Sequence, residues 1–313
     1  MEIEERILKD YDEAWKRLIE LFFPEFMEFF FPKYASYIDF NKKIKFLDKE
    51  LKKLFPKSKE EKGEVDLLIE CYLKNGNKLP LYLHIDIQGY YDTSFSQRMF
   101  RYLYRIYDRF KKFPISLVVF SDKYKNYHPN KFEWKFEENY LFYKYPYAKL
   151  LDYLGREKEL TKSKNPFAKI VKAFLAEYKA KGNVNLKFLF RKELIKELKE
   201  LGYSKERIIE LYRVIALFVS LPEKMEEQIF EEFDKELLEG GNKEMIVLPF
   251  EKKAYKRGKE EGLKEGLKEG LRKGVLMEKK NLAKKLYKKG YSLETISELL
   301  EINVETLKNW LEK

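Results

Sequence analysis

Two acidic residues interrupt otherwise apolar segments, and their spacing could place their carboxylates side by side. Asp66 lies in the segment 64–70, and Asp86 lies in the alternating segment 81–88. If these segments pair as neighbouring strands, the two residues can sit opposite each other with Cβ atoms about 5 Å apart. Two carboxylates this close repel each other unless a proton or a divalent cation lies between them. Mg²⁺ binds one or two carboxylates and keeps waters for phosphate chemistry, so the pair outlines a metal-dependent phosphodiester site.

The elements that must position this pair are two strands and a tight turn. Residues 81–88 alternate apolar and polar side chains, which predicts a strand because successive strand residues point to opposite faces. The polar residues on one face are Tyr82, His84, Asp86 and Gln88. Asn75-Gly76 lies between the two segments, and this dipeptide is the strongest short-range signal for a hairpin. We therefore predict that residues 64–73 and 81–88 are antiparallel neighbours.

Further helices and strands are expected in the first half of the chain. Apolar residues three and four apart predict helices over residues 3–31, with an interruption at Pro24, and over residues 94–112. Three other segments have the alternating or β-branched character of strands: residues 45–48, 115–120 and 131–145. The second of these is apolar on both faces, which is typical of a central buried strand.

We expect the chain to divide into four parts. Residues 1–150 would form an α/β core, and residues 151–250 would form a helical domain. Residues 251–276 would form a charged helical arm, and residues 277–313 a small helix-turn-helix-like module. This module has two readings, a packing or assembly unit and a sequence-specific DNA reader. Glu305 lies early in the last helix, where its negative charge would be repelled by DNA phosphates, which argues against the DNA reader.

The expected arm has a glycine at every fourth position from Gly258 to Gly274. Each glycine in a helix is unfavourable by about 1 kcal/mol relative to alanine, so the repeat requires an explanation. Two readings remain open. Residues 255–274 form either a weakly helical tether or an oligomerisation arm in which two helices approach closely along the glycines. The many charges exclude a membrane-embedded GxxxG dimer.

Composition and charge narrow the classes of function. The net charge of +11 favours polyanionic partners such as nucleic acid, although surfaces rich in Lys and Glu also occur in heat-adapted proteins. Cys71 is the only cysteine, which excludes an intrachain disulfide and indicates a reducing cytoplasm. No segment approaches about 18 consecutive apolar residues, so we expect no membrane span. Only His84 and His128 are present, which argues against histidine-rich zinc sites and Ser-His-Asp triads.

Three motifs together resemble a known group of nucleases. They are Asp66 on one predicted strand, Asp86-Ile87-Gln88 on the next, and Gln97-Arg98-Met99-Phe100-Arg101-Tyr102 in the following helix. This pattern resembles the PD-(D/E)XK nuclease superfamily and, more narrowly, the Rpn family of recombination-promoting nucleases and transposases. Residues 46–51, the Phe-rich first helix and the glycine-rich tail are also similar to that family. The resemblance implies an αβββαβ core and divalent-metal hydrolysis of DNA.

Carried onto this chain, the resemblance assigns roles to individual residues. Asp66 and Asp86 would be the acidic metal ligands, with the main-chain carbonyl of Ile87 as a further ligand for Mg²⁺ or Mn²⁺. Gln88 stands where most superfamily nucleases have lysine. Its amide can orient a water but carries no positive charge, so slow catalysis is expected. Many members also have a metal-facing glutamate on the first helix, a role for which Glu13 or Glu20 could serve.

Arginines form a stripe on the helix predicted over residues 94–112. They recur at spacings of three and four, at Arg98, Arg101, Arg105 and Arg109. The stripe would flank the acids and hold the DNA backbone, because phosphate contacts position a nucleic acid without reading its bases. Ion pairs with nearby Asp and Glu residues are the alternative.

Two functions remain open at this point. The first is a Mg²⁺-dependent DNA endonuclease related to transposases. The second is a catalytically weak or inactive nuclease-fold protein that acts as a DNA-binding or oligomeric assembly module.

Overall fold

The computed structural model describes residues 2–54, 65–75, 79–233, 270 and 274–311. The chain forms two compact units, Met1–Pro249 and Phe250–Lys313. The expected α/β core and the expected helical domain both lie in the first unit. None of the described helices combines the length and the apolar character that crossing a bilayer requires.

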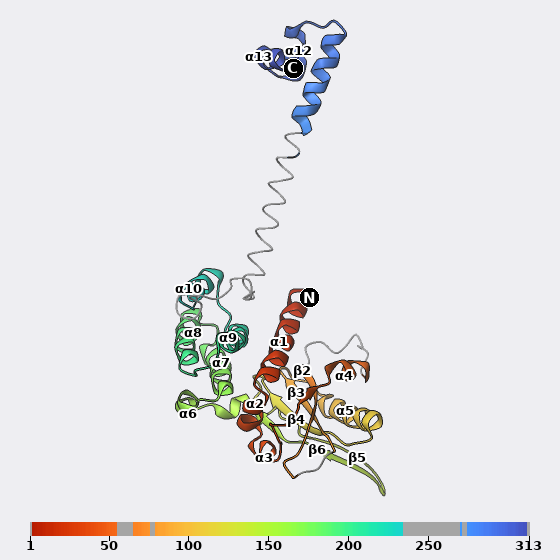
Figure 1. Cartoon of the computed structure of the whole chain (residues 1–313), viewed down its shortest axis with the longest axis vertical. Helices are drawn as coiled ribbons and strands as arrows, with labels where there is room; N and C mark the ends of the chain where they lie inside the picture. The colour runs from red at the N-terminus through yellow and green to blue at the C-terminus, as the bar shows by residue number, and fades with distance from the viewer. Residues whose placement is uncertain (1, 55–64, 76–78, 234–269, 271–273, 312–313) are drawn as a thin grey trace. The chain divides into compact units, whose positions relative to one another are not determined.

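A mixed five-stranded sheet forms the centre of the first unit (Figure 1). In spatial order its strands are β1 (Lys45–Phe46), β2 (Val65–Cys71), β3 (Leu81–Gln88), β4 (Ile115–Phe120) and β7 (Tyr147–Lys149). Strands β1, β2 and β3 pair antiparallel, whereas β3, β4 and β7 pair parallel. The expected mixed α/β architecture is confirmed, and so is the antiparallel pairing of β2 with β3. That the sheet belongs to a PD-(D/E)XK fold stays a prediction.

The register of β2 and β3 places the two central acids directly opposite each other. Asp66 pairs with Asp86, and the adjacent residues Leu67 and Ile85 pair on the other face of the sheet. Leu67 and Ile85 are completely buried, so a slip of one residue would turn apolar side chains toward the acid cluster and polar ones into the apolar layer on the other face. The hydrophobic face of the hairpin therefore holds the acids in register.

Helices α4 (Asp48–Leu54) and α5 (Phe95–Phe110) cover the face of the sheet that carries the acids (Figure 1). Their buried side chains share one apolar cluster with the sheet: Leu51, Leu68, Tyr82, Tyr102 and Ile106. The strand expected over residues 45–48 is shorter than predicted. Asp48 begins α4, and its position in the first turn suits an acid at a helix N-terminus.

The N-terminal helices pack against the helical half of the first unit. They are α1 (Glu2–Leu21), α2 (Phe23–Phe30) and α3 (Pro32–Ala35). The break after α1 falls at Phe22, so Pro24, the predicted interruption, lies in the first turn of α2. Trp15 of α1 stacks on Phe167 at the start of α7 (Pro166–Ala180), with ring centroids 6.4 Å apart. The remaining helices of this half are α6 (Glu157–Lys162), α8 (Val184–Lys199), α9 (Lys205–Phe218) and α10 (Glu223–Phe233), after a 3-10 turn at Leu150–Tyr153.

Residues 131–144 form a separate two-stranded ribbon. Strands β5 (Lys131–Phe136) and β6 (Asn139–Lys144) pair antiparallel, in agreement with the one or two strands predicted within 131–145. Phe132 stacks on Phe100 of α5, with ring centroids 4.7 Å apart. This contact ties one end of the ribbon to α5, and the ribbon extends away from the main sheet (Figure 1).

The described part of the second unit, residues 274–311, contains three short helices around a small apolar core. Residues 274–288 are helical, followed by α12 (Leu293–Leu300) and α13 (Val304–Leu311). The core residues are Ala283, Ile296, Leu300 and Leu307. The side chains of Ser292 and Asn303 accept hydrogen bonds from the main-chain amides three residues later, as N-caps do. Within the glycine repeat only Gly270 and Gly274 are described, so the predicted oligomerisation arm at 255–274 lies outside the described residues.

Candidate metal centre

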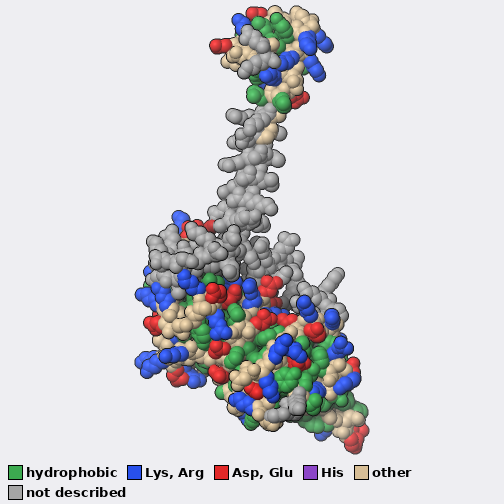
Figure 2. Space-filling view, in the orientation of Figure 1, with side chains coloured by type: hydrophobic (Ala, Val, Ile, Leu, Met, Phe, Trp, Pro, Cys, Tyr) green, Lys and Arg blue, Asp and Glu red, His purple; other side chains and the backbone are tan. Residues whose placement is uncertain are grey.

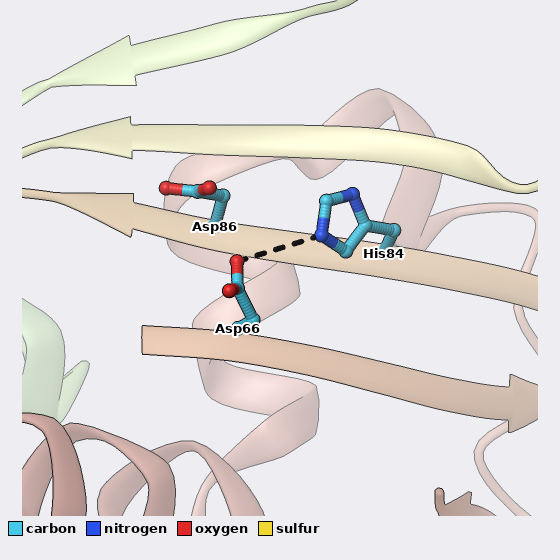
Figure 3. Close-up of side chains that lie close together, drawn as sticks. All are labelled: Asp66, His84 and Asp86. Carbon is cyan, nitrogen blue, oxygen red and sulfur yellow. Dashed lines mark ion pairs between the residues drawn. The ribbon is translucent and has the colours of Figure 1, made fainter. Parts of the chain in front are cut away.

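Figure 3 shows the side chains of Asp66, His84 and Asp86 close together on one face of the sheet. Helix α5 covers this face, because its Arg98 and Tyr102 contact the two acids. One potential ligand atom from each residue lies within 4.8 Å of the other two. Nε2 of His84 is 3.6 Å from Oδ1 of Asp66. Carboxylate oxygens and imidazole nitrogens are common ligands of divalent cations. The predicted pair of acids is therefore confirmed as a cluster that could hold a metal ion, with His84 as a third candidate ligand.

The cluster contains polar atoms that are buried without hydrogen bonds. Oδ1 of Asp66, Nε2 of His84 and Oδ1 of Asp86 have no hydrogen-bond partner among the residues that the structure describes. Leaving such an atom unsatisfied is unfavourable by about 1–3 kcal/mol. All three atoms belong to the cluster, so a cation bound there would satisfy them together. The donor set of this site therefore fits a divalent metal ion.

Neighbouring side chains hold the three candidate ligands in place. The hydroxyl of Tyr102 donates a hydrogen bond to Oδ2 of Asp66, and the Tyr102 ring packs on His84 with centroids 4.4 Å apart. Nδ1 of His84 lies 3.4 Å from the hydroxyl of Ser116 on β4. Contacts of this kind fix the orientation of metal ligands and raise metal affinity.

Burial and mutual repulsion separate the proton affinities of the two acids. Burial raises the pKa of Asp86 well above its usual value, and the negative charge of Asp66 adds to this effect. Burial also disfavours the charged form of Asp66, but the His84 ring, whose Nε2 lies 3.6 Å away, and the hydrogen bond from the Tyr102 hydroxyl keep the pKa of Asp66 below the usual value. Without a cation, these opposite shifts favour a state in which the two acids share one proton.

Arg98 lies inside the site and contacts two of the predicted site residues. Its Nη2 is 3.3 Å from Oδ2 of Asp86 and donates to Oε1 of Gln88 at 2.7 Å. The Gln88 amide nitrogen donates in turn to the carbonyl of Tyr90 at 2.7 Å. The side chain of Ile87 is buried on the opposite face of the sheet, and metal ligation by its carbonyl stays a prediction.

The predicted arginine stripe does not form one surface. Arg98 is buried, with 2% of its surface exposed, in line with the ion-pair alternative. Arg105 donates to the carbonyl of Leu54 at 3.0 Å, and Arg101 is exposed. A role in DNA binding therefore stays a prediction for Arg101 and Arg105, whereas Arg98 is positioned to act at the acid cluster.

Asp12 on α1 is a site residue that the sequence reasoning missed. Its Oδ1 is buried without a hydrogen-bond partner in the described part of the chain. Burial raises the pKa of Asp12 to about 7; the charge of Lys16 opposes the rise and that of Asp66 adds to it. The Glu13 and Glu20 side chains, which we considered for the first helix, are both exposed.

The position of α1 explains why Asp12 is the acid that faces the cluster. The hydroxyl of Tyr11 donates to the Ser121 hydroxyl, just beyond β4, at 3.0 Å. This bond holds the middle of α1 at the edge of the sheet where β3 and β4 end. Successive helix residues differ by about 100°, so only one of two adjacent acids can point at the sheet.

Comparison with known proteins identifies a similarity in the second unit. Residues 278–313 match the family described as "Putative ATPase subunit of terminase (gpP-like)". No curated protein and no solved structure matches the chain at the level of significance that we required. The matched residues include α12 and α13 but none of the residues of the acid cluster. The case for a metal centre therefore rests on the geometry of Asp66, His84 and Asp86.

Proposed function

We propose that this protein is a Mg²⁺- or Mn²⁺-dependent DNA endonuclease, related to transposases and acting in DNA recombination. The observation that carries the proposal is the convergence of Asp66, His84 and Asp86, whose buried ligand atoms lack hydrogen-bond partners among the described residues. The net charge of +11 favours a polyanionic substrate. The resemblance of the strand and helix motifs to recombination-promoting nucleases supports DNA as that substrate.

The residues of the site divide the chemistry among them. Asp66, Asp86 and His84 would hold the cation, with the Ile87 carbonyl as a further ligand. When bound, the cation would lower the pKa of a water and neutralise charge on the phosphate. Asp12 has a pKa of about 7, which suits a group that accepts a proton from an attacking water at neutral pH.

Arg98 would supply the positive charge that Gln88 lacks. Its guanidinium contacts both Gln88 and Asp86, so it would act close to the position at which the resemblance implies a lysine. A guanidinium presents several donors in a fixed plane and binds phosphate oxygens well. Gln88 would then position Arg98 as well as orienting a water.

Plasmid nicking tests this proposal. Supercoiled plasmid is incubated with Mg²⁺ or Mn²⁺ and with the wild-type chain, Asp66→Ala, Asp86→Ala or the control Asp108→Ala, all purified identically. The side chain of Asp108 lies on α5 and is 82% exposed. We expect metal-dependent nicking by the wild type and the control, and loss of nicking in both cluster variants. Nicking that persists in the cluster variants would overturn the assignment of the site.

A second candidate function is a DNA-binding or oligomeric assembly protein with a weak or inactive nuclease fold. It is favoured by Gln88 at the lysine position and by the similarity of residues 278–313 to a terminase subunit family. It predicts DNA binding that survives Asp66→Ala and Asp86→Ala, and self-association that depends on residues 255–274. A light-scattering measurement on the chain truncated after residue 250 tests the arm. An unchanged number of chains per particle would exclude it as the site of association.

A further inference from the structure

A pocket lies at the edge of the sheet where β3 and β4 end. These parallel strands finish together, because Gln88 is the register partner of Phe120, and the Ser121 amide donates to the Gln88 carbonyl at 2.9 Å. The segments that follow, 91–93 and 124–129, line a pocket of about 730 Å³. Crevices beyond the carboxyl ends of parallel strands are common ligand sites, and this volume is in the usual range for them.

Tyrosines form the wall of this pocket. Tyr91 and Tyr124 are 56% and 57% exposed, and their ring centroids are 5.6 Å apart. Tyr91 also packs on Tyr127 at 4.7 Å. The hydroxyl of Tyr127 donates to the Asp92 carbonyl at 3.0 Å and accepts from the Asp92 amide at 3.1 Å. The aromatic wall is therefore anchored at its buried end and offers ring surface to the solvent at its other end.

The polar groups of the pocket suit a nucleotide. Lys125, Asn126 and His128 line it and are exposed, so they offer a positive charge for a phosphate and donors and acceptors for a base edge. The pocket also contains one acid, Asp92. Its carboxylate accepts hydrogen bonds from the amide and the hydroxyl of Ser94, at 2.8 and 2.7 Å, so its charge is partly satisfied within its own turn.

Short connections join the pocket to the acid cluster. Gln88 donates to the carbonyl of Tyr90, and Nη1 of Arg98 lies 3.5 Å from the Tyr90 hydroxyl. Tyr90 immediately precedes Tyr91 of the pocket wall. A strand whose phosphate lies at the acid cluster could therefore place an adjacent base against the tyrosines.

We propose that this pocket binds an unpaired nucleobase next to the cleaved phosphodiester, so that the substrate is single-stranded or locally unpaired DNA. That the bound strand is DNA, with its phosphodiester at the acid cluster, rests on the proposed nuclease function. A base in a duplex has both faces covered by its neighbours and must leave the stack before an aromatic side chain can contact it. Stacking on aromatic side chains accepts any base, so the pocket would select unpaired structure rather than sequence.

A binding measurement without cleavage tests the pocket directly. Fluorescence anisotropy with Ca²⁺ in place of Mg²⁺ compares a labelled single-stranded oligonucleotide with the same sequence as a duplex. The full-length variants are Tyr91→Ala, Tyr124→Ala and the control Tyr37→Ala, whose side chain is 56% exposed but lies outside the pocket. We expect the two pocket variants to bind the single strand about tenfold to a hundredfold more weakly than the wild type and the control. Equal affinities in all four proteins would overturn the inference.

A cleavage measurement separates the pocket from the nuclease function. Single-stranded substrates carry one abasic position each, scanned along the sequence. We expect slower cleavage at one position beside the cut, and no further slowing there by Tyr91→Ala, because the base that the tyrosine contacts is already missing. If the wild-type protein cleaves duplex and single strand equally, and neither tyrosine substitution changes the rate, the proposed role of the pocket is wrong but the nuclease function stands. If binding of the single strand depends on the tyrosines but no DNA is cleaved, the nuclease function is wrong but the pocket still binds an unpaired base.

Discussion

The guanidinium of Arg98 lies 3.3 Å from the carboxylate of Asp86, and both side chains are almost completely buried. When a bound cation keeps Asp86 ionised, this contact is a buried ion pair. Removing two charges from water is unfavourable, and their attraction in the interior does not always compensate for it. A buried pair is therefore weak evidence of a stabilising role. Because Asp86 also belongs to the candidate metal centre, the pair places a fixed positive charge beside the position proposed for the substrate phosphate.

Arg98→Ala should slow DNA nicking far more than it weakens metal binding. Loss of one preorganised donor to a developing negative charge typically reduces the rate by a factor of about 10² to 10³. Arg98→Lys should retain part of the rate, because lysine keeps the positive charge. The rest should be lost, because one ammonium cannot contact Asp86 and Gln88 in the same way. The measurement is the single-turnover nicking rate at saturating Mn²⁺, with Arg156→Ala as control, because Arg156 is 54% exposed and lies outside both the cluster and the predicted DNA-binding helix. A normal rate in Arg98→Ala would exclude this role, and the thermal unfolding of each variant shows whether it is folded.

Mn²⁺ should raise the unfolding temperature of the wild-type protein but not that of Asp66→Ala or Asp86→Ala. A ligand that binds only the folded state at 100 times its dissociation constant stabilises it by about 2.7 kcal/mol. Asp108→Ala should respond like the wild type, because its exposed side chain lies outside the cluster. Differential scanning fluorimetry with and without EDTA measures the shift. Equal shifts in all four proteins would place the bound metal elsewhere.

Tyr102→Phe should weaken metal binding while preserving the fold. The substitution removes the hydroxyl that donates to Asp66 but keeps the ring that packs on His84. Loss of such an outer contact typically lowers metal affinity about tenfold to a hundredfold. Isothermal titration with Mn²⁺ provides the measurement. Tyr107→Phe, on the exposed side of α5, is the matched control, and equal affinities in the two variants would contradict the role of Tyr102.

The β2–β3 hairpin could be predicted because local signals and burial agree. Alternation over residues 81–88 assigns the faces, and Asn75-Gly76 favours the antiparallel connection. Together they place Asp66 opposite Asp86, as the structure shows. His84 shares the strand face of Asp86, so its place in the cluster was also visible in the pattern. Nothing in the alternation, however, distinguishes a metal-binding histidine from a structural one.

The orientation of helix side chains was harder to predict. Arg98, Met99 and Tyr102 have the spacing of one helix face, and all three are buried. The other arginines follow similar spacings, so the stripe alone could not show which member faces the sheet. On α1, Asp12 and Glu13 differ by one position, and the contact between Tyr11 and Ser121 decides between them. Such long-range contacts depend on how helices dock, which local periodicity does not specify.

Asp12 should make the metal-free protein less stable as the pH rises. Its pKa is about 7 in the folded state and about 3.9 in an unfolded chain. Between these values the folded state keeps a proton that the unfolded state has lost. The free energy of unfolding therefore decreases with rising pH over this window. The raised pKa of Asp86 acts in the same direction, whereas the lowered pKa of Asp66 acts in the opposite direction at lower pH.

Urea unfolding in EDTA at pH 5 and pH 7.5 measures this dependence. Asp12→Asn should lose part of the decrease, because the amide does not titrate, and Glu13→Gln should behave like the wild type because Glu13 is exposed. Adding Mn²⁺ at pH 7.5 should restore stability to the wild type, since a cation replaces the proton between the acids. An identical change with pH in Asp12→Asn and the wild type would show that Asp12 titrates independently of folding and does not face the buried site.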